Sequence, residues 1–159
     1  MDWDTEILKG EVWRAMKADT KTESEVMSTV KKCFEAFAMK DLDAMMAFFA
    51  PDPDVVVIGT GGDERGVGFA EVKAIFERAF SQFDEASFDF GWHYVSVAGP
   101  LALLATDIAL RVKASDREVS QQIRLTGVLE KRGDRWLILQ SHDSVPDRDQ
   151  AEGEAFPSK

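Results

Sequence analysis

His142 is the side chain in this sequence with the clearest capacity for proton transfer. It follows Trp136 in a run typical of a strand, and because side chains alternate along a strand, Trp136, Ile138, Gln140 and His142 are expected on one face. With Trp136 directed inward, Gln140 and His142 would line a pocket. An imidazole with a pKa near ~6.5 can move a proton near neutral pH, or bind a carboxylate when it is charged. We therefore predict His142 as a catalytic candidate and ligand contact; the alternative is a structural histidine bonded to its neighbours.

Polar residues on the two preceding strands could lie beside Gln140 and His142 in the same predicted pocket. A hairpin turn near residues 115–116 would place Asp107 opposite Arg124, and the last hairpin would bring Arg124 beside His142 and Thr126 beside Gln140. Arg124 is then predicted to anchor an anion, Thr126 to contact the ligand, and Asp107 to be a second candidate for proton transfer. The alternative is a solvated ion pair on the outer face, because a slip of one residue turns every side chain over.

An aromatic row precedes these strands. Phe88, Phe90, Trp92 and Tyr94 alternate, so Trp92 and Tyr94 are predicted to wall a flat apolar ligand, with the Tyr94 hydroxyl orienting it. Packing in the core is the alternative for these rings. His93 is out of phase with the row and is expected to point away from it, towards the surface or a dimer contact.

The remaining candidates for chemistry predict no metal and no cofactor. Cys33 is the only cysteine, which excludes an intrachain disulfide and a cysteine-based zinc site. The acidic residues between positions 52 and 64 lack the spacing of an EF-hand, and the run GTGGDERG lacks the lysine of a phosphate-binding loop.

Composition limits the partners of the chain. Its 159 residues are 45% apolar and predict one domain with a sizeable core. The formal net charge of −10 repels phosphate backbones and anionic lipids, so no nucleic acid or membrane partner is expected. The acidic beginning contains no unbroken apolar stretch, which favours a cytoplasmic protein without an export signal.

Hydrophobic periodicity predicts an α+β domain. Helices are expected over 5–18, from a capping box at 22–25 to about residue 37, over 41–49 and over 68–83; strands are expected over 55–58, 88–97, 101–112, 119–131 and 136–145. We divide the chain into a helical arm (1–21), a domain (22–146) and a solvated tail (147–159). The N-terminal helices should pack on a curved antiparallel sheet that encloses a pocket. Residues 101–104 and 137–139 are apolar on both faces, so a homodimer through the outer face is expected.

The ending WLILQSHDSVP resembles the closing strand of nuclear transport factor 2-like proteins, particularly the SnoaL-like ones. Trp136, Ile138, His142 and Ser144 match the spacing W-x-I-x-x-x-H-x-S, which is also similar to the association domain of calcium/calmodulin-dependent kinase II. The run VVVIGTGGDERGVG resembles the first strand and turn of SnoaL-like proteins, so the resemblance covers residues 22–146. It implies a cone of helices and curved sheet around a pocket.

The resemblance also implies classes of activity. Ketosteroid isomerases of this superfamily use an aspartate just after the first strand, and cyclases resembling SnoaL depend on an acidic pocket group. This chain has Ile58 and Gly59 there, so Asp107 is the acidic residue that we predict as a substitute. The leading expectation is a SnoaL-like protein that binds a small, partly apolar molecule, anionic if Arg124 contacts it. The alternatives are an isomerase, cyclase or dehydratase-like enzyme with His142 as acid or base, and an oligomerisation or protein-binding module.

Overall fold

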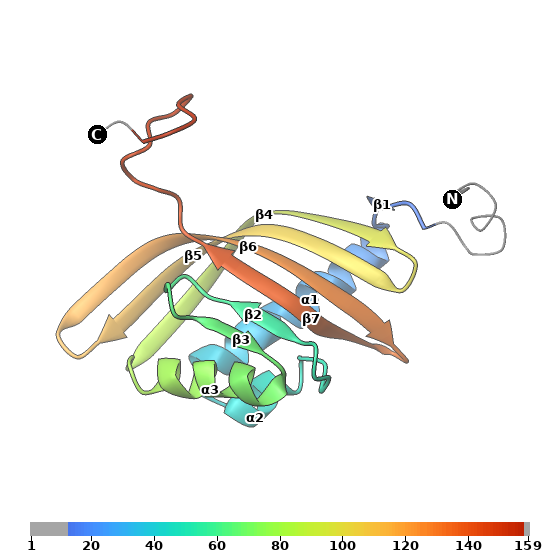
Figure 1. Cartoon of the computed structure of the whole chain (residues 1–159), viewed down its shortest axis with the longest axis horizontal. Helices are drawn as coiled ribbons and strands as arrows, with labels where there is room; N and C mark the ends of the chain where they lie inside the picture. The colour runs from blue at the N-terminus through green and yellow to red at the C-terminus, as the bar shows by residue number, and fades with distance from the viewer. Residues whose placement is uncertain (1–12, 158–159) are drawn as a thin grey trace, which may run out of the picture.

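The computed structural model describes residues 13–157, and within them three helices cover the concave face of one curved, open sheet (Figure 1). Over the same residues the sheet has seven strands in the order β1-β4-β5-β6-β7-β2-β3. This is the α+β cone that the sequence predicts, and the helices and sheet leave space between them for a site.

The helices begin where side chains can accept hydrogen bonds from free backbone N–H groups. In α1 (Thr20–Ala38) the Asp19 carboxylate accepts from the Thr22 N–H at 2.7 Å, so Asp19 is the cap and not the predicted box at 22–25. In α2 (Leu42–Met46) Asp41 accepts from the Ala44 N–H at 3.0 Å, as predicted. The third helix, α3 (Phe69–Phe80), lies within the predicted range.

The predicted N-terminal helix is wrong over its described part. The structure describes this segment from residue 13 onward, and Met16–Lys17 forms the short strand β1, which pairs with β4. The Ala18 N–H also donates to the Val95 carbonyl at 2.9 Å. Pairing with the free edge of β4 satisfies the backbone groups that a helix would otherwise satisfy internally.

Four long strands form the antiparallel meander that the sequence predicts: β4 (Glu85–Ala98), β5 (Leu101–Ala114), β6 (Arg117–Arg132) and β7 (Arg135–Ser144). The predicted strand at 55–58 is β2 (Val56–Ile58), which runs parallel to β7. The sheet is therefore mixed rather than fully antiparallel. A further strand, β3 (Arg65–Val67), was not predicted; it is short and pairs only with β2 among the described strands.

Two register shifts decide which side chains face the helices. In β4 the pairing shifts between Phe90 and His93. In β7, Ile138 pairs with Leu129 while Gln140 pairs with Val128, so Leu139 is an extra residue in the ladder. An extra residue reverses the alternation of every side chain that follows it. Both shifts alter the site.

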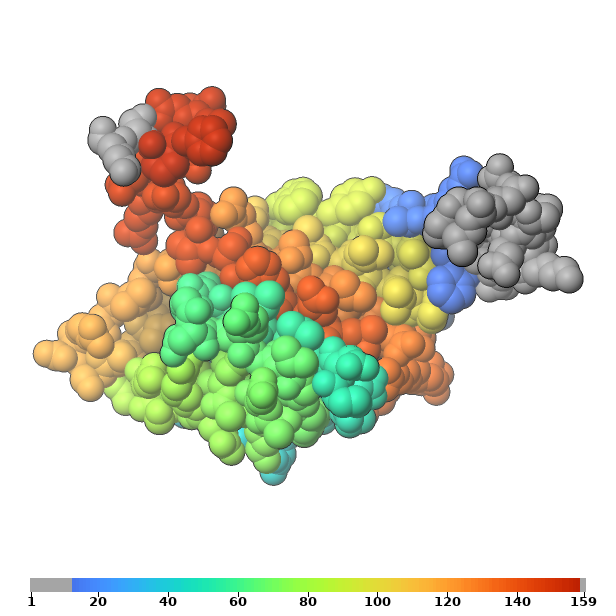
Figure 2. Space-filling model, in the orientation of Figure 1, coloured from blue at the N-terminus to red at the C-terminus, as the bar shows by residue number. Residues whose placement is uncertain are grey.

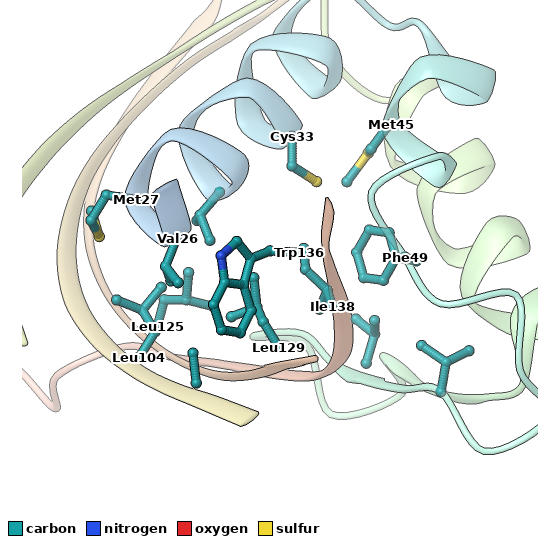
Figure 3. Close-up of a cluster of buried hydrophobic side chains, with 14 of the residues drawn as sticks. Val26, Met27, Cys33, Met45, Phe49, Leu104, Leu125, Leu129, Trp136 and Ile138 are labelled. Carbon is teal, nitrogen blue, oxygen red and sulfur yellow. The ribbon is translucent and has the colours of Figure 1, made fainter. Parts of the chain in front are cut away.

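The core lies between α1 and the concave face of the sheet (Figure 3). Trp136 is buried among side chains of α1, β5 and β6, and its indole N–H donates to Glu25 at 3.1 Å. Cys33 of α1 and Met45 of α2 direct their sulfur atoms into the same interior as Phe49 and Ile138 (Figure 3). This packing fixes the first half of β7 against the helices.

The outer parts of the chain surround this core. In the space-filling view β2, β3 and α3 form one continuous surface in front of the sheet, and the segment after β7 projects from the body (Figure 2). That segment is mostly exposed from residue 146 to residue 157 and has no helix or strand over those residues. None of the helices within residues 13–157 combines the length and the apolar character needed to cross a membrane.

Candidate functional site

A cavity of about 240 Å³ lies between the helices and the sheet. Its walls are mainly apolar, with contributions from α1, α2, α3 and every long strand. Six phenylalanines line it: Phe34, Phe37, Phe49, Phe76, Phe83 and Phe88. A concave apolar space with few polar groups is the usual form of a small-molecule site.

The phenylalanines form a connected cluster around Phe37. Its ring stacks on Phe83, with 5.3 Å between centroids, and meets Phe76 and Phe88 edge-on at 6.2 and 5.6 Å. Aromatic pairs in these geometries stabilise the fold by more than the burial of their apolar area alone would. The aromatic wall therefore comes from α1, α3 and the start of β4, and it has a fixed shape.

The polar groups of the cavity come from two neighbouring segments. Ser141 and Asp143 line it from the second half of β7, and Thr60 and Glu64 line it from the connection between β2 and β3. Because β2 is parallel to β7, the end of β2 lies beside Asp143. Thr60 is exposed and the Glu64 side chain is 29% exposed, so these two residues lie at the rim while Asp143 lies deeper.

Asp143 has the least satisfied polar group of the cavity. Its Oδ1 atom is buried and has no hydrogen-bond partner among the residues that the structure describes. Burial in an apolar surrounding, with a smaller contribution from the charge of Glu64, raises the pKa of Asp143 from an ordinary 3.8 to about 7. A carboxyl group in this state can give up or accept a proton near neutral pH.

Cys33 lies close to this carboxyl group. Burial, and secondarily the charge of Asp143, raises the pKa of the Cys33 thiol far above its usual range. The thiol is therefore neutral and has no nucleophilic role, and we assign it to packing in the cavity wall.

Glu64 is held in place by the turn that it closes. Its Oε2 accepts from the Gly61 N–H at 2.8 Å, and its Oε1 lies 3.7 Å from the Arg78 guanidinium. Gly59 permits this arrangement, since a Cβ there would lie 2.4 Å from Glu64 Oε2. Gly59 is thus needed for the close approach of the Glu64 side chain.

The polar residues predicted to line the pocket lie on the other side of the sheet. All five are exposed, and none of them lines the cavity: Asp107, Arg124, Thr126, Gln140 and His142. Asp107 does pair with Arg124 in the register that we predicted. The predicted pairing of β6 with β7 is wrong, because Arg124 lies opposite Ser144 and Thr126 opposite His142. The extra residue Leu139 explains the error, because it turns His142 outward and Asp143 inward.

The predicted aromatic contacts are also misplaced. Trp92 is 61% and Tyr94 is 44% exposed, and both lie outside the cavity, which Phe88 does line. The shift in β4 turns Trp92 and Tyr94 outward and turns His93 towards α1. There the His93 Nε2 lies 3.0 Å from a Glu23 carboxylate oxygen. His93 thus points away from Trp92 and Tyr94, as expected, but it meets a helix and not the surface or a dimer contact.

Sequence reasoning missed Glu64, Ser141 and Asp143. The run 137–139 is apolar at every position, which hides the point at which the alternation reverses. The usable signal was Asp143 itself, an acidic residue beside a histidine in a strand that begins with a core tryptophan. Within residues 13–157 no group of three or more His, Cys, Asp or Glu side chains is arranged to hold a metal ion.

Comparison with known protein families identifies the family to which this fold belongs. The family model described as "SnoaL-like domain" matches residues 26–148. The chain belongs to the SnoaL-like family. A comparison of this SnoaL-like chain with curated protein sequences finds no match.

Solved structures share the fold of this SnoaL-like domain. A candidate dehydratase of the nuclear transport factor 2-like family from Streptomyces avermitilis has a TM-score of 0.73 and 19% identity, over 81% of this chain and 99% of that chain. A nuclear transport factor 2-like superfamily protein from Salmonella enterica has a TM-score of 0.75 and 16% identity, over 87% and 100%. A candidate calcium/calmodulin-dependent protein kinase II association domain from Xanthomonas campestris has a TM-score of 0.70 and 21% identity, over 83% and 95%. Identities this low establish the common fold alone.

Proposed function

We propose that this SnoaL-like domain binds a small, largely apolar molecule in its cavity through a hydrogen bond donated to Asp143. The observation that supports this most directly is the buried Asp143 Oδ1, which has no partner within the described chain and faces an apolar space. A buried acceptor without a donor costs free energy, and a ligand that supplies the donor recovers it.

The size of the cavity limits the ligand. An apolar cavity of about 150 Å³ holds benzene, so the 240 Å³ here suits a single ring with a short substituent or a small bicyclic compound. The anionic ligand considered from sequence is disfavoured, because Arg124 is exposed outside the cavity while Glu64 and Asp143 line it. A negatively charged ligand would be repelled by both carboxyl groups.

Thermal unfolding in the presence of phenethyl alcohol and related one-ring alcohols tests this proposal. We expect a melting temperature that rises with ligand concentration, because a ligand that binds only the folded state stabilises it. The variant Ala79→Phe fills the cavity and should lose the response; Ala74→Phe, on an exposed position of the same helix, should keep it. If no compound of the series stabilises the wild type, the proposal is wrong.

A catalytic role is the second candidate, favoured by the pKa of Asp143, which burial raises to about 7. In this version Asp143 takes the acid or base role that the sequence suggested for His142, in a dehydratase-like or isomerase reaction of a carbonyl compound. The similarity to a candidate dehydratase supports the reaction class only as an analogy. With a substrate in hand, Asp143→Asn should abolish turnover and retain binding, whereas His142→Ala should leave the rate unchanged.

A homodimer through the outer face of the sheet remains our proposal for assembly. Trp92, Tyr94 and Leu103 are exposed on that face. The face extends across four neighbouring strands, because Tyr94 of β4 pairs with Ala105 of β5, which pairs with Thr126 of β6 and so with His142 of β7. These exposed apolar side chains, which lie beside the polar residues of the same face, favour association.

Light scattering after size exclusion tests this assembly. The wild type should have the mass of two chains and Leu103→Lys that of one. A monomeric wild type would contradict the dimer, and also the alternative role as an oligomerisation module. A cytoplasmic location stays a prediction from sequence, to be checked by cell fractionation.

A further inference from the structure

The charges that reach the cavity have one sign. Its described lining contains the carboxyl groups of Glu64 and Asp143 and no lysine, arginine or histidine. Glu64 is compensated by Arg78, which lies 3.7 Å from it and whose side chain is 42% exposed, so this positive charge lies towards the surface. Glu64 is therefore paired with a guanidinium group and accepts a backbone hydrogen bond. The Oδ1 atom of Asp143 has neither a cation nor a hydrogen-bond donor within the described residues.

A ligand can satisfy Asp143 in different ways according to its charge. An alcohol supplies a donor and leaves the carboxylate charge uncompensated inside an apolar wall. An ammonium group supplies both a donor and the opposite charge, and hydrogen bonds between charged partners are roughly twice as strong as neutral ones. A carboxylate ligand supplies neither and adds a further negative charge beside Glu64 and Asp143.

The walls of the cavity suit a cation attached to an apolar body. Six phenylalanine rings line it, and the face of such a ring attracts a cation electrostatically. The protein already places one ammonium group in this way, since Lys40 Nζ lies 4.6 Å from the centroid of Phe83. The net charge of −10 also raises the concentration of cations around the molecule.

We propose that the cavity takes a hydrophobic amine in its protonated form, with the ammonium group bound to Asp143 beside Glu64 and the apolar body among the phenylalanines. This inference rests on the proposed function, because it names the chemical class of ligand for the same cavity.

Calorimetric titration with three compounds of nearly equal size tests the charge preference: phenethylamine, phenethyl alcohol and phenylacetate. Slightly above neutral pH we expect phenethylamine to bind at least tenfold more tightly than the alcohol, and phenylacetate to give no measurable heat. A result in which the alcohol binds as tightly as the amine overturns the inference and leaves the proposed function standing. Binding of phenylacetate overturns both, because a carboxylate donates no hydrogen bond to Asp143. If none of the three binds, the proposed function fails together with it.

The pH dependence of binding provides a second measurement on the wild type. The amine stays protonated below about pH 9, like a lysine side chain, so its affinity should rise as Asp143 loses its proton. The ionisable groups that face Asp143 are Glu64 from the β2–β3 connection, with Arg78 of α3 behind it, and Cys33 of α1. Affinity for the alcohol should not rise over the same range. An amine affinity that stays constant from acid to neutral pH would contradict the ion pair.

Variants separate the ion pair from general effects of charge. Asp143→Asn should reduce the affinity for phenethylamine to that for phenethyl alcohol. Asp63→Asn removes a carboxylate of the same hairpin that also contacts Arg78 but faces solvent, and it should leave the preference unchanged. An equal loss in both variants would mean that the surface charge of the protein, and not Asp143, selects the amine.

Discussion

Replacing Asp143 by asparagine should change how stability depends on pH. Burial and the nearby Glu64 raise the pKa of Asp143 from 3.8 to about 7 in the folded protein. Between these two values the folded state retains a proton that the unfolded chain has released. Stability therefore falls as the pH rises, by about 1.4 kcal/mol per pH unit, until Asp143 ionises in the folded state as well.

The size of the effect follows from the difference between the two pKa values. A shift of about 3 units corresponds to a ceiling of about 4 kcal/mol, of which about 3 kcal/mol falls between about pH 5 and about pH 8. Asparagine has nearly the same shape and does not titrate. The free energy of unfolding of Asp143→Asn, relative to wild type, should therefore rise by about this amount over the same range.

Other carboxyl groups act in the opposite direction and cancel in this comparison. Hydrogen bonds from Thr22, Lys131, Arg132 and Arg78 lower the pKa of Asp19, Glu25, Asp52 and Asp63 respectively, so their stabilisation is lost on acidification. Both proteins contain these groups. The difference between variant and wild type isolates Asp143.

Urea unfolding at several pH values measures the effect directly. The control is Asp149→Asn, which removes a carboxylate from an exposed position of the terminal segment and should not reproduce the effect of Asp143→Asn. A carboxyl-carbon NMR titration should also show the pKa of Asp143 falling in Glu64→Gln, which removes the neighbouring charge. If the difference between Asp143→Asn and wild type stays constant across the range, Asp143 is not the buried acid described above.

Three further predictions concern the fold, each checked by urea unfolding. Gly59→Ala should destabilise the protein by about 1–3 kcal/mol, because the new Cβ would lie 2.9 Å from Glu64 Cβ, which cannot move without the backbone; Gly62→Ala, with no atom within 4 Å, should change stability by under about 0.5 kcal/mol. Val95→Ala, at a fully buried position, should cost about 2 kcal/mol or more, whereas Val119→Ala, at a position 45% exposed, should cost clearly less; equal costs would contradict the described core. Asp19→Ala should cost about 1 kcal/mol, because it removes the acceptor for the Thr22 N–H, and no loss would mean that the first turn of α1 is satisfied in another way.

The main architecture was predictable because it depends on local patterns. The helical spacing in α1 and α3, the Asp41 cap of α2 and the turns between the long strands are all signals within a few residues of sequence. The pairing of Asp107 with Arg124 also followed, since a hairpin turn fixes the register of its two strands. The strand β1 could not be predicted in this way, because its partner in β4 is about 80 residues away.

The sequence by itself determined the family, the order of most elements and the presence of an apolar interior with few polar groups. The tertiary structure decided which polar group enters that interior. Leu139 can be an extra residue in β7 because Ile138 is held on its other side by the Phe48 carbonyl and the Ala50 N–H, at 2.8 and 2.9 Å. That distant contact fixes the phase of the strand, and so it is Asp143, and not His142, that faces the cavity.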